Sequence, residues 1–309
     1  MALLGGCVMA DILIIGGGPA GLAAGVYAVR AGAKPVLFEQ QLPGGRVNYT
    51  DIVENYPGFE PTSGMELALK LVQHAQRFGV EIRQEKVERL TVEKGVAVET
   101  SRGSYEAPCA IIATGTRAKT LGVDGEKELL GRGISLCAVC DGPLYKGKEV
   151  VVVGGGDSAL TEALFLTRFV ERVHLVHRRD EFRGAATLVQ RVRNNEKITL
   201  HLSRVVKRFE SEGGKLKRVV LASTKGEPDQ TLEVEGAFLY VGNTPNTEFL
   251  EVKLEQDRGG YIVTDERMRT SVERLFAAGD VRAKVLRQIA TAVADGAVAA
   301  VSAVEEWLH

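Results

Sequence analysis

Short runs of consecutive apolar residues, each closed by glycines, recur along the chain. The first run, Asp11–Ile15, leads directly into the glycine-rich segment Gly16–Gly21. Such runs, without polar alternation, are typical of strands covered on both faces in a parallel sheet. A segment rich in alanine and valine, Leu22–Ala31, predicts a helix that Gly32 ends before the strand Pro35–Glu39. The pattern predicts a β-α-β unit.

The same pattern occurs a second time further along the chain. Glu149–Val153 is followed by the glycine turn Gly154–Ala159, a helix and the strand Val173–His177. Residues 16–39 align with 154–177 without a gap, 138 positions apart. The repeat predicts two domains of one plan, each with its own nucleotide site.

Three later segments alternate apolar and polar residues instead of running continuously apolar. They span residues 199–209, 216–224 and 231–241. This alternation predicts antiparallel strands that close the second domain near Gly242.

Two more apolar runs, Cys109–Gly115 and Leu275–Asp280, end in glycine turns on either side of the second repeat. If both belong to the first sheet, the second domain is an insertion in the first. We therefore expect an α/β protein of two Rossmann-like three-layer domains of the dinucleotide-binding kind, the second inserted in the first. The expected boundaries are 1–117 with 247–309 for the first domain and 118–246 for the second.

Composition and charge narrow the class of protein. The chain has 309 residues, 45% of them hydrophobic, and a formal net charge of -1, which gives no bulk electrostatic reason to expect nucleic acid or an anionic membrane as a partner. Four cysteines are too few for a secreted disulfide scaffold, and we expect no secretory signal, because Met1–Ala10 has no cationic segment ahead of an apolar core. We expect a cytoplasmic protein.

The glycine turns are the expected cofactor sites. Glycines in a G-x-G pattern let backbone N–H groups approach a pyrophosphate at a helix N-terminus. One such turn alone could be purely structural, but two in register, each between a strand and a helix, favour two dinucleotides. The assigned contacts are Gly16, Gly18, Pro19, Ala20 and Gly21 in the first copy and Gly154, Gly156, Asp157, Ser158 and Ala159 in the second.

The residues at the end of the second strand separate the two ligands. The first copy has Glu39, which can accept hydrogen bonds from ribose hydroxyls, whereas the second has His177, Arg178 and Arg179, with Arg183 nearby. A carboxylate would repel a 2′-phosphate and arginines would bind it, although a solvated basic helix start is an alternative. The correspondence predicts FAD in the first site and NADPH in the second.

A close cysteine pair, Cys137 and Cys140, is the candidate reactive element. Two intervening residues allow a disulfide within one turn, and a helix N-terminus would favour the attacking thiolate. Zinc is the main alternative for this spacing, but Cys7, Cys109 and the scattered histidines offer no second ligand pair at the usual spacing. Asp141, next in sequence, can exchange a proton or cap a helix.

The C-terminal segment supplies one more candidate contact. Arg287, Gln288 and Ile289 precede the alanine-rich stretch Ala290–Trp307, which predicts a helix. Its N-terminus would suit the negative charge of a reduced flavin, although an ordinary packed terminal helix explains the stretch equally.

In their order, these motifs resemble low-molecular-weight thioredoxin reductase over nearly the whole chain after residue 10. The matching segments are Gly16–Gly21, Glu54–Gly58, Ala113–Gly115, Cys137–Asp141, Gly154–Ala159 with Glu162, His177–Arg179 with Arg183, Gly279–Asp280 and Arg287–Gln288. The resemblance implies a homodimer, reduction of a thioredoxin or thioredoxin-like protein, and FAD contacts at Glu39, Asn55, Ala113, Thr114, Gly115, Gly279, Asp280 and Gln288. It also implies that Cys140 faces the flavin, that Cys137 attacks the partner's disulfide and that Asp141 is the acid.

One departure concerns the partner. Pro143 and Leu144 follow Asp141-Gly142 where better-known members carry an aromatic pair used in docking thioredoxin. Rival interpretations are a small-molecule dithiol oxidase, which should lack the arginines at 178–183, and a ferredoxin–NADP reductase, which should lack both cysteines. A flavin-bound redox sensor would need no hydride donor.

Overall fold

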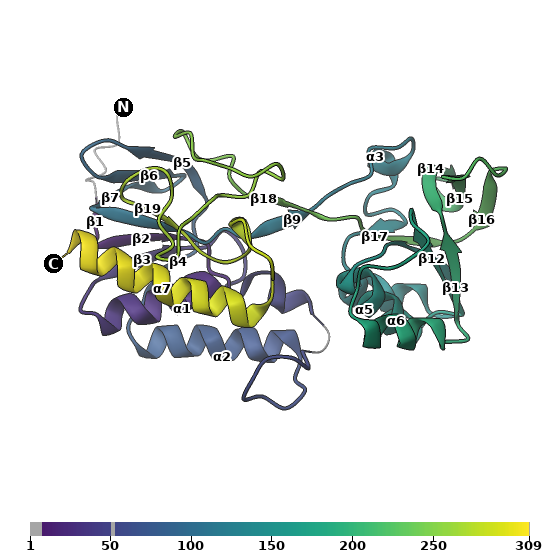
Figure 1. Ribbon diagram of the computed structural model, residues 1–309, viewed down its shortest axis with the longest axis horizontal. Helices are drawn as coiled ribbons and strands as arrows, with labels where there is room; N and C mark the ends of the chain where they lie inside the picture. Colours follow the sequence, from purple (N-terminus) through teal and green to yellow (C-terminus); the bar gives the residue numbers. More distant parts are fainter. Residues whose placement is uncertain (1–7, 51–52, 309) are drawn as a thin grey trace. The chain divides into compact units, whose positions relative to one another are not determined.

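The computed structural model describes residues 8–50 and 53–308, which form two compact units. The first runs up to Arg117 and resumes at Thr244, and the second is the inserted segment Ala118–Asn243. The return crossing therefore lies three residues before the expected boundary at residue 246. The fold class, two Rossmann-like α/β domains with the second inserted in the first, is confirmed (Figure 1).

The first unit is built on a parallel five-stranded sheet in the order β19-β8-β2-β3-β4. Helices cover one face of this sheet, and a smaller sheet in the order β1-β7-β6-β5 covers the other (Figure 1). Its elements are β1 (Val8–Met9), β2 (Ile12–Ile15), α1 (Pro19–Arg30), β3 (Pro35–Phe38), η1 (Gly45–Tyr49), α2 (Gly64–Arg77), β4 (Glu81–Arg83), β5 (Val87–Val92), β6 (Val96–Thr100), β7 (Gly103–Ala107), β8 (Cys109–Ile112), β19 (Leu275–Ala277), η3 (Gly279–Val281) and α7 (Ile289–Trp307).

The second unit repeats the plan with a five-stranded parallel sheet in the order β10-β17-β11-β12-β13. An antiparallel sheet, β14-β15-β16, covers the face opposite the helices. Its elements are α3 (Glu126–Leu129), β10 (Ile134–Ser135), α4 (Ala138–Asp141), η2 (Gly142–Tyr145), β11 (Glu149–Gly154), α5 (Asp157–Leu166), β12 (Arg172–His177), α6 (Ala186–Arg193), β13 (Ile198–Leu202), β14 (Arg204–Glu212), β15 (Lys215–Ser223), β16 (Gln230–Glu233) and β17 (Gly236–Tyr240). The chain enters this unit at β9 (Thr116–Ala118) and leaves it at β18 (Asn243–Pro245), and these two strands pair as a ribbon.

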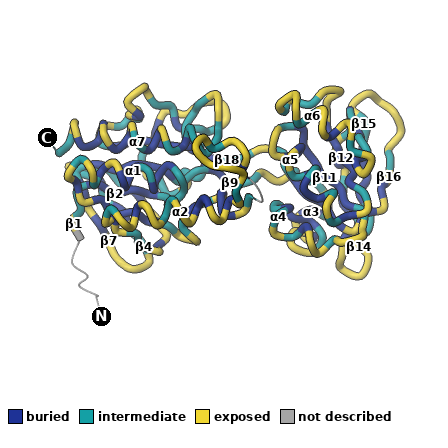
Figure 2. The backbone as a smooth tube through the Cα atoms, turned by 90° about the horizontal axis from the view of Figure 1, so that it is seen from below, coloured by how far each residue is buried: buried dark blue, intermediate teal, exposed yellow. Residues whose placement is uncertain are grey.

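The apolar runs form the buried centre of each unit (Figure 2). In β2, Ile12 and Ile14 pack on the helices, while Leu13 and Ile15 pack on the smaller sheet. Because successive side chains of a strand point to opposite faces, a strand covered on both faces must be apolar at every position. This is why the runs show no alternation.

Two of the expected antiparallel segments are each divided between the two sheets of the second unit. Residues 199–209 include most of β13, which pairs parallel with β12, and the start of β14, which is antiparallel to β15. Ser203 lies between them with a φ of 53°, a left-handed conformation that ends a strand. Residues 231–241 likewise contain most of β16, and all of β17, which is parallel to β11. None of the helices in the described part of the chain could cross a membrane.

Candidate active site

The first glycine turn joins β2 to α1 by close backbone contacts. Gly16 has a φ of 108°, and a Cβ there would lie 2.4 Å from the carbonyl oxygen of Ala113. A Cβ at Gly21 would lie 1.9 Å from the carbonyl oxygen of Gly16. Only glycine fits at both positions, so α1 begins tight against the end of the sheet.

Open space remains beside the helix N-terminus in both turns. A Cβ at Gly18 would find its nearest neighbour, the Cα of Gly45, at 4.0 Å. A Cβ at Gly156, the matching residue of the second turn, would meet no described atom within 4 Å. Each turn therefore has a backbone cradle of the kind that a pyrophosphate occupies.

Glu39 spans the first turn from the end of β3. One carboxylate oxygen accepts a hydrogen bond from Gly17 N at 2.8 Å, and the other accepts one from Gln41 N at 2.8 Å. Each carboxylate oxygen has a second lone pair, so a fixed Glu39 can still accept bonds from ribose hydroxyls.

A buried charged cluster lies where η3 meets α7. Asp280 Oδ1 and Arg287 Nε are buried and have no hydrogen-bond partner among the described residues. Burial raises the pKa of Asp280, and the nearby cations Lys284, Arg287 and Arg46 oppose that rise. Buried polar atoms are almost always paired in folded proteins, so these two atoms indicate a polar ligand. The hydroxyl-rich chain of FAD fits them.

The remaining expected flavin contacts are brought together in the same unit. Asn55 donates a hydrogen bond from Nδ2 to Gln288 Oε1 at 3.2 Å. Thr114 donates from Oγ1 to the carbonyl of Asn246 at 2.7 Å, and Asn246 Nδ2 donates back to the carbonyl of Thr114 at 2.9 Å. Gly279, with a φ of 79°, packs directly on Ala20, where a Cβ would approach to 2.8 Å.

The second glycine turn is enclosed by the arginine-bearing loop. Arg183 N donates to the carbonyl oxygen of Gly155 at 2.8 Å, and Ala185 N donates to Asp157 Oδ1 at 2.6 Å. The side chains of Arg178, Arg179 and Arg183 are exposed. They are free of the core and can reach an anion beside the turn.

His177 is placed differently from the arginines that follow it. Its side chain is buried, with 5% of its surface exposed, and a Cβ at Gly155 would lie 2.3 Å from its ring. The ring stacks on Phe182 and bonds the carbonyl of Glu181 at 3.1 Å. Burial lowers its pKa, which favours the neutral ring. His177 therefore fills space behind the turn, and the exposed arginines carry the positive charge.

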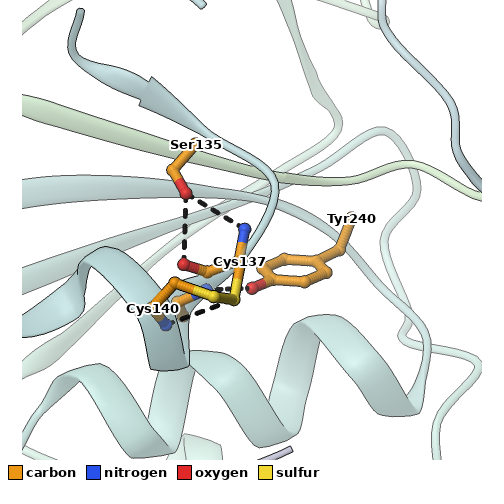
Figure 3. Close-up of a disulfide and its surroundings, with 5 residues drawn as sticks. Ser135, Cys137, Cys140 and Tyr240 are labelled. Atoms are coloured by element: carbon orange, nitrogen blue, oxygen red, sulfur yellow. Dashed lines mark hydrogen bonds between the residues drawn. A yellow bond between two sulfur atoms is a disulfide. The ribbon is translucent and has the colours of Figure 1, made fainter. Parts of the chain in front are cut away.

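Cys137 and Cys140 form a disulfide in which the two Cα atoms are 5.4 Å apart (Figure 3). Cys137 caps α4, and the backbone N–H of Cys140 donates to Cys137 Sγ at 3.2 Å. A hydrogen bond to sulfur favours the thiolate, so Cys137 is the better placed of the two to carry negative charge after reduction. Asp141 is the last residue of the same turn.

The other described cysteine is chemically quiet. Cys109 is fully buried in β8, and burial raises the pKa of its thiol to about 12. Cys7 lies outside the described residues. Within residues 8–50 and 53–308, no three His, Cys, Asp or Glu side chains gather in a way that could hold a metal ion.

Comparison with known proteins agrees with this geometry. The model of the pyridine nucleotide-disulphide oxidoreductase family matches residues 10–296. The chain belongs to this family. Thioredoxin reductase of Bacillus subtilis (strain 168) is 45% identical over 293 residues, which cover 94% of this chain and 93% of that protein.

Solved structures lead to the same family. The crystal structure of Lactococcus lactis thioredoxin reductase is 40% identical, with a TM-score of 0.93 and coverage of 96% of this chain and 98% of the other. The thioredoxin reductase of T. acidophilum is 36% identical, also with a TM-score of 0.93, and the match covers 97% and 99% of the two chains.

Sequence reasoning missed residues that support the candidate site through hydrogen bonds within the protein. Four residues make hydrogen bonds to segments distant in sequence or to the turn Cys137–Asp141, here called the redox turn. They are Asn246, Ser135, Tyr240 and Asp295. None of them belongs to a motif with a fixed spacing. Only the fold, which brings separate strand ends together, reveals them.

Proposed function

We propose that this chain is an NADPH-dependent thioredoxin-disulfide reductase. The observation that carries the proposal is a Cys137–Cys140 disulfide in the same compact unit as a glycine turn flanked by exposed arginines. A dithiol oxidase would not need the arginines, and a ferredoxin–NADP reductase would not need the cysteines. The 45% identity to the thioredoxin reductase of Bacillus subtilis supports the same activity.

FAD is the cofactor of the first unit. Its pyrophosphate is held at the turn of Gly16, Gly18 and Gly21, and Glu39 accepts hydrogen bonds from its adenosine ribose. Asp280 Oδ1 and Arg287 Nε then gain the hydrogen-bond partners that these two atoms lack among the described residues. Bound FAD supplies a carrier that takes two electrons from NADPH and gives them to a disulfide.

NADPH is the electron donor, and the second unit binds it. The N-terminus of α5 at Gly156 and Asp157 receives the pyrophosphate. Arg178, Arg179 and Arg183 bind the 2′-phosphate through charge-assisted hydrogen bonds, which are about twice as strong as neutral ones. His177 contributes by packing against Gly155 rather than by touching the phosphate.

The two cysteines have different tasks. Cys137 attacks the disulfide of the partner, because the amide of Cys140 stabilises its thiolate. Cys140 would be the cysteine that exchanges electrons with bound flavin, and its thiolate displaces the reduced partner from the mixed disulfide on Cys137. Asp141 supplies a proton to a departing thiolate.

The partner binds next to the redox turn. A groove of about 500 Å³ is lined by Arg132, Leu144, Tyr145, Lys148 and Lys215, among others. Leu144 is 72% exposed and takes the place of part of the family's aromatic docking pair. The groove is also lined by one acid, Glu235, so its three cations leave a net positive charge around one exposed apolar side chain, which suits a carrier with an apolar face and an acidic rim. Leu144→Ala should raise the KM for thioredoxin and leave reduction of the enzyme by NADPH unchanged.

Two further properties follow from the resemblance. The protein is expected to be a homodimer, which light scattering during size-exclusion chromatography would test. It is expected to act in the cytoplasm, where thiols are kept reduced and close cysteine pairs serve catalysis.

The experiment that tests the function is steady-state oxidation of NADPH with a panel of disulfides. Thioredoxin, a glutaredoxin-like protein and glutathione disulfide are each supplied to the FAD-loaded enzyme. We expect turnover with thioredoxin and at least about 100-fold lower kcat/KM with glutathione disulfide, which lacks a surface for the groove. Equal activity with every disulfide would contradict a thioredoxin reductase.

A further inference from the structure

The redox turn is clamped by a serine that precedes it. Ser135, the last residue of β10, is buried, with 6% of its surface exposed. Its Oγ accepts a hydrogen bond from Cys137 N at 3.0 Å and donates one to the carbonyl of Cys137 at 3.1 Å. Both backbone polar groups of Cys137 are therefore bound to one hydroxyl group (Figure 3).

A second clamp comes from the other end of the sequence of this unit. Tyr240 Oη accepts a hydrogen bond from the backbone N–H of Ala138 at 2.8 Å (Figure 3). The two residues are 102 positions apart in sequence. The bond fixes the first residue of α4, immediately after Cys137, to the end of β17.

Ser135 and Tyr240 both belong to the central sheet of the second unit. β10 pairs with β17, and Ser135 lies opposite Phe238 in this pairing. Tyr240 lies opposite Gly154, where a Cβ would approach its carbonyl oxygen to 2.5 Å. Its ring also packs against the buried apolar cluster under α5. Neither anchor can shift without disturbing the sheet, so Cys137 is held in one place.

We propose that Ser135 and Tyr240 are positioning residues that favour the Cys137–Cys140 disulfide over the dithiol. Reduction breaks the Sγ–Sγ bond, adds two electrons and two protons, and leaves two thiols. A turn that keeps Cys137 fixed keeps its sulfur close to that of Cys140 after reduction, which raises the effective concentration of one thiol at the other. The dithiol becomes a stronger reductant for the partner. The inference rests on the proposed function only in that the pair cycles between these two states.

The test measures the dithiol–disulfide equilibrium of the FAD-loaded enzyme. Wild type and Tyr240→Phe are equilibrated anaerobically in mixtures of reduced and oxidised dithiothreitol. The oxidised fraction of the Cys137–Cys140 peptide is then measured by alkylation and mass spectrometry. We expect the equilibrium constant for disulfide formation to fall about 10-fold in Tyr240→Phe, which is about 30 mV less reducing.

Two serine variants provide an independent arm. Ser135→Ala removes both hydrogen bonds to Cys137 and should lower the constant by a similar factor, whereas Ser135→Thr keeps the hydroxyl and should restore at least half of the change on a logarithmic scale. If Tyr240→Phe fails to fold, this pair alone decides. A serine with a purely structural role would leave the equilibrium unchanged in Ser135→Ala, so there would be no change for Ser135→Thr to reverse.

The control is Tyr105→Phe in the first unit. Tyr105 donates its buried hydroxyl to Glu85 at 3.1 Å and accepts a hydrogen bond from Arg83 Nη1 at 2.9 Å, so the variant also loses phenolic hydrogen bonds, but in the other compact unit. It should unfold at a lower temperature and keep the wild-type equilibrium. Equilibrium constants within twofold of wild type in Tyr240→Phe and Ser135→Ala would overturn the proposal. Because this measurement uses no thioredoxin, failure of the thioredoxin assay is a separate result.

Discussion

The two glycine turns have the same backbone plan and differ in what closes them. In both, the first glycine lies against the carbonyl of a neighbouring strand end, with hypothetical Cβ distances of 2.4 Å from Ala113 O at Gly16 and 2.5 Å from Tyr240 O at Gly154. In both, the second glycine accommodates the side chain that ends the next strand, Glu39 or His177. The close packing is thus a property of the fold rather than of one ligand.

The differences between the turns fall at the positions that a ligand can reach. Glu39 is half-buried and bonds two backbone amides with its carboxylate, whereas His177 is buried and its charged form is disfavoured. In the proposed binding mode, the residue at the strand end would contact the ribose in the first turn, whereas in the second turn its side chain is packed against Gly155. We therefore propose that the exposed arginines that follow select the 2′-phosphate.

The largest effect expected from this comparison is on coenzyme choice. In Arg178→Ala/Arg179→Ala, loss of two charge-assisted bonds of about 1.5–3 kcal/mol each should lower kcat/KM for NADPH by roughly 10²- to 10⁴-fold. The value for NADH should hardly change. Steady-state kinetics with both coenzymes measure this, with Arg193→Ala on α6 as the control. An equal loss of kcat/KM with NADPH and NADH would show that these arginines do not bind the 2′-phosphate.

The next effect concerns the first turn. Glu39→Ala removes the acceptor of Gly17 N and the proposed acceptor of the ribose hydroxyls. The dissociation constant of FAD should rise by about 100-fold, because two charged hydrogen bonds are lost and partly replaced by water. Flavin fluorescence during titration of the apoprotein measures it, and Glu88→Gln, an exposed change on β5, should leave the affinity unaltered. Unchanged FAD binding in Glu39→Ala would show that Glu39, like His177, does not contact a ligand.

A pair of alanine substitutions separates folding from ligand binding. Gly16→Ala places a methyl group 2.4 Å from Ala113 O at a positive φ and should cost about 2–4 kcal/mol of unfolding free energy. Gly156→Ala points its methyl group into open space at an extended φ of -104° and should cost less than about 1 kcal/mol. Gly156→Ala should nevertheless weaken the binding of NADPH, because the methyl group enters the proposed pyrophosphate site. Urea unfolding measures the loss of stability, and coenzyme titration measures the loss of binding. If Gly16→Ala is as stable as wild type, the backbone can relax around the contact with Ala113 O.

The smallest expected effect is the pH dependence contributed by His177. Burial lowers its pKa in the folded protein below the ordinary value of 6.5, so the unfolded chain binds the proton more tightly. The contribution to stability is present above about pH 6.5 and is lost as the pH falls through the folded-state pKa. Between pH 5 and 8, the free energy of unfolding measured in urea should depend less steeply on pH in His177→Gln than in wild type. Identical slopes would mean that the buried ring does not titrate in this range.

The sequence predicts the fold well wherever one rule acts over a short segment. Continuous apolar runs revealed the parallel strands, and the repeat at an offset of 138 positions revealed the second copy of the unit. The smaller sheet of β1, β5, β6 and β7 and the helix α2 were not predicted, although Ser63 caps α2 and Glu66 follows three residues later, a spacing that is typical of a helix start. The division of residues 199–209 between two sheets depends on the left-handed Ser203, which no local pattern announces.

For the candidate site, the residue types could be predicted from the sequence, but the exposure of their side chains could not. Aligned copies placed His177 opposite Glu39, and only the structure shows that one is buried behind its turn. Ser135 and Tyr240 act through backbone groups of Cys137 and Ala138, so their partners depend on how β10 and β17 pair. Such contacts are tertiary and leave no signature in spacing.

The most direct measurement is the electron balance of one reaction. FAD-loaded enzyme, NADPH and oxidised thioredoxin are mixed without oxygen, and NADPH consumed is compared with thioredoxin thiols formed. We expect two thiols for each NADPH in the wild type and none in Cys137→Ser or Cys140→Ser, since each variant lacks one half of the dithiol. Thiol formation that persists in either variant, or NADPH oxidation by wild type without thiols, would contradict transfer through the Cys137–Cys140 pair.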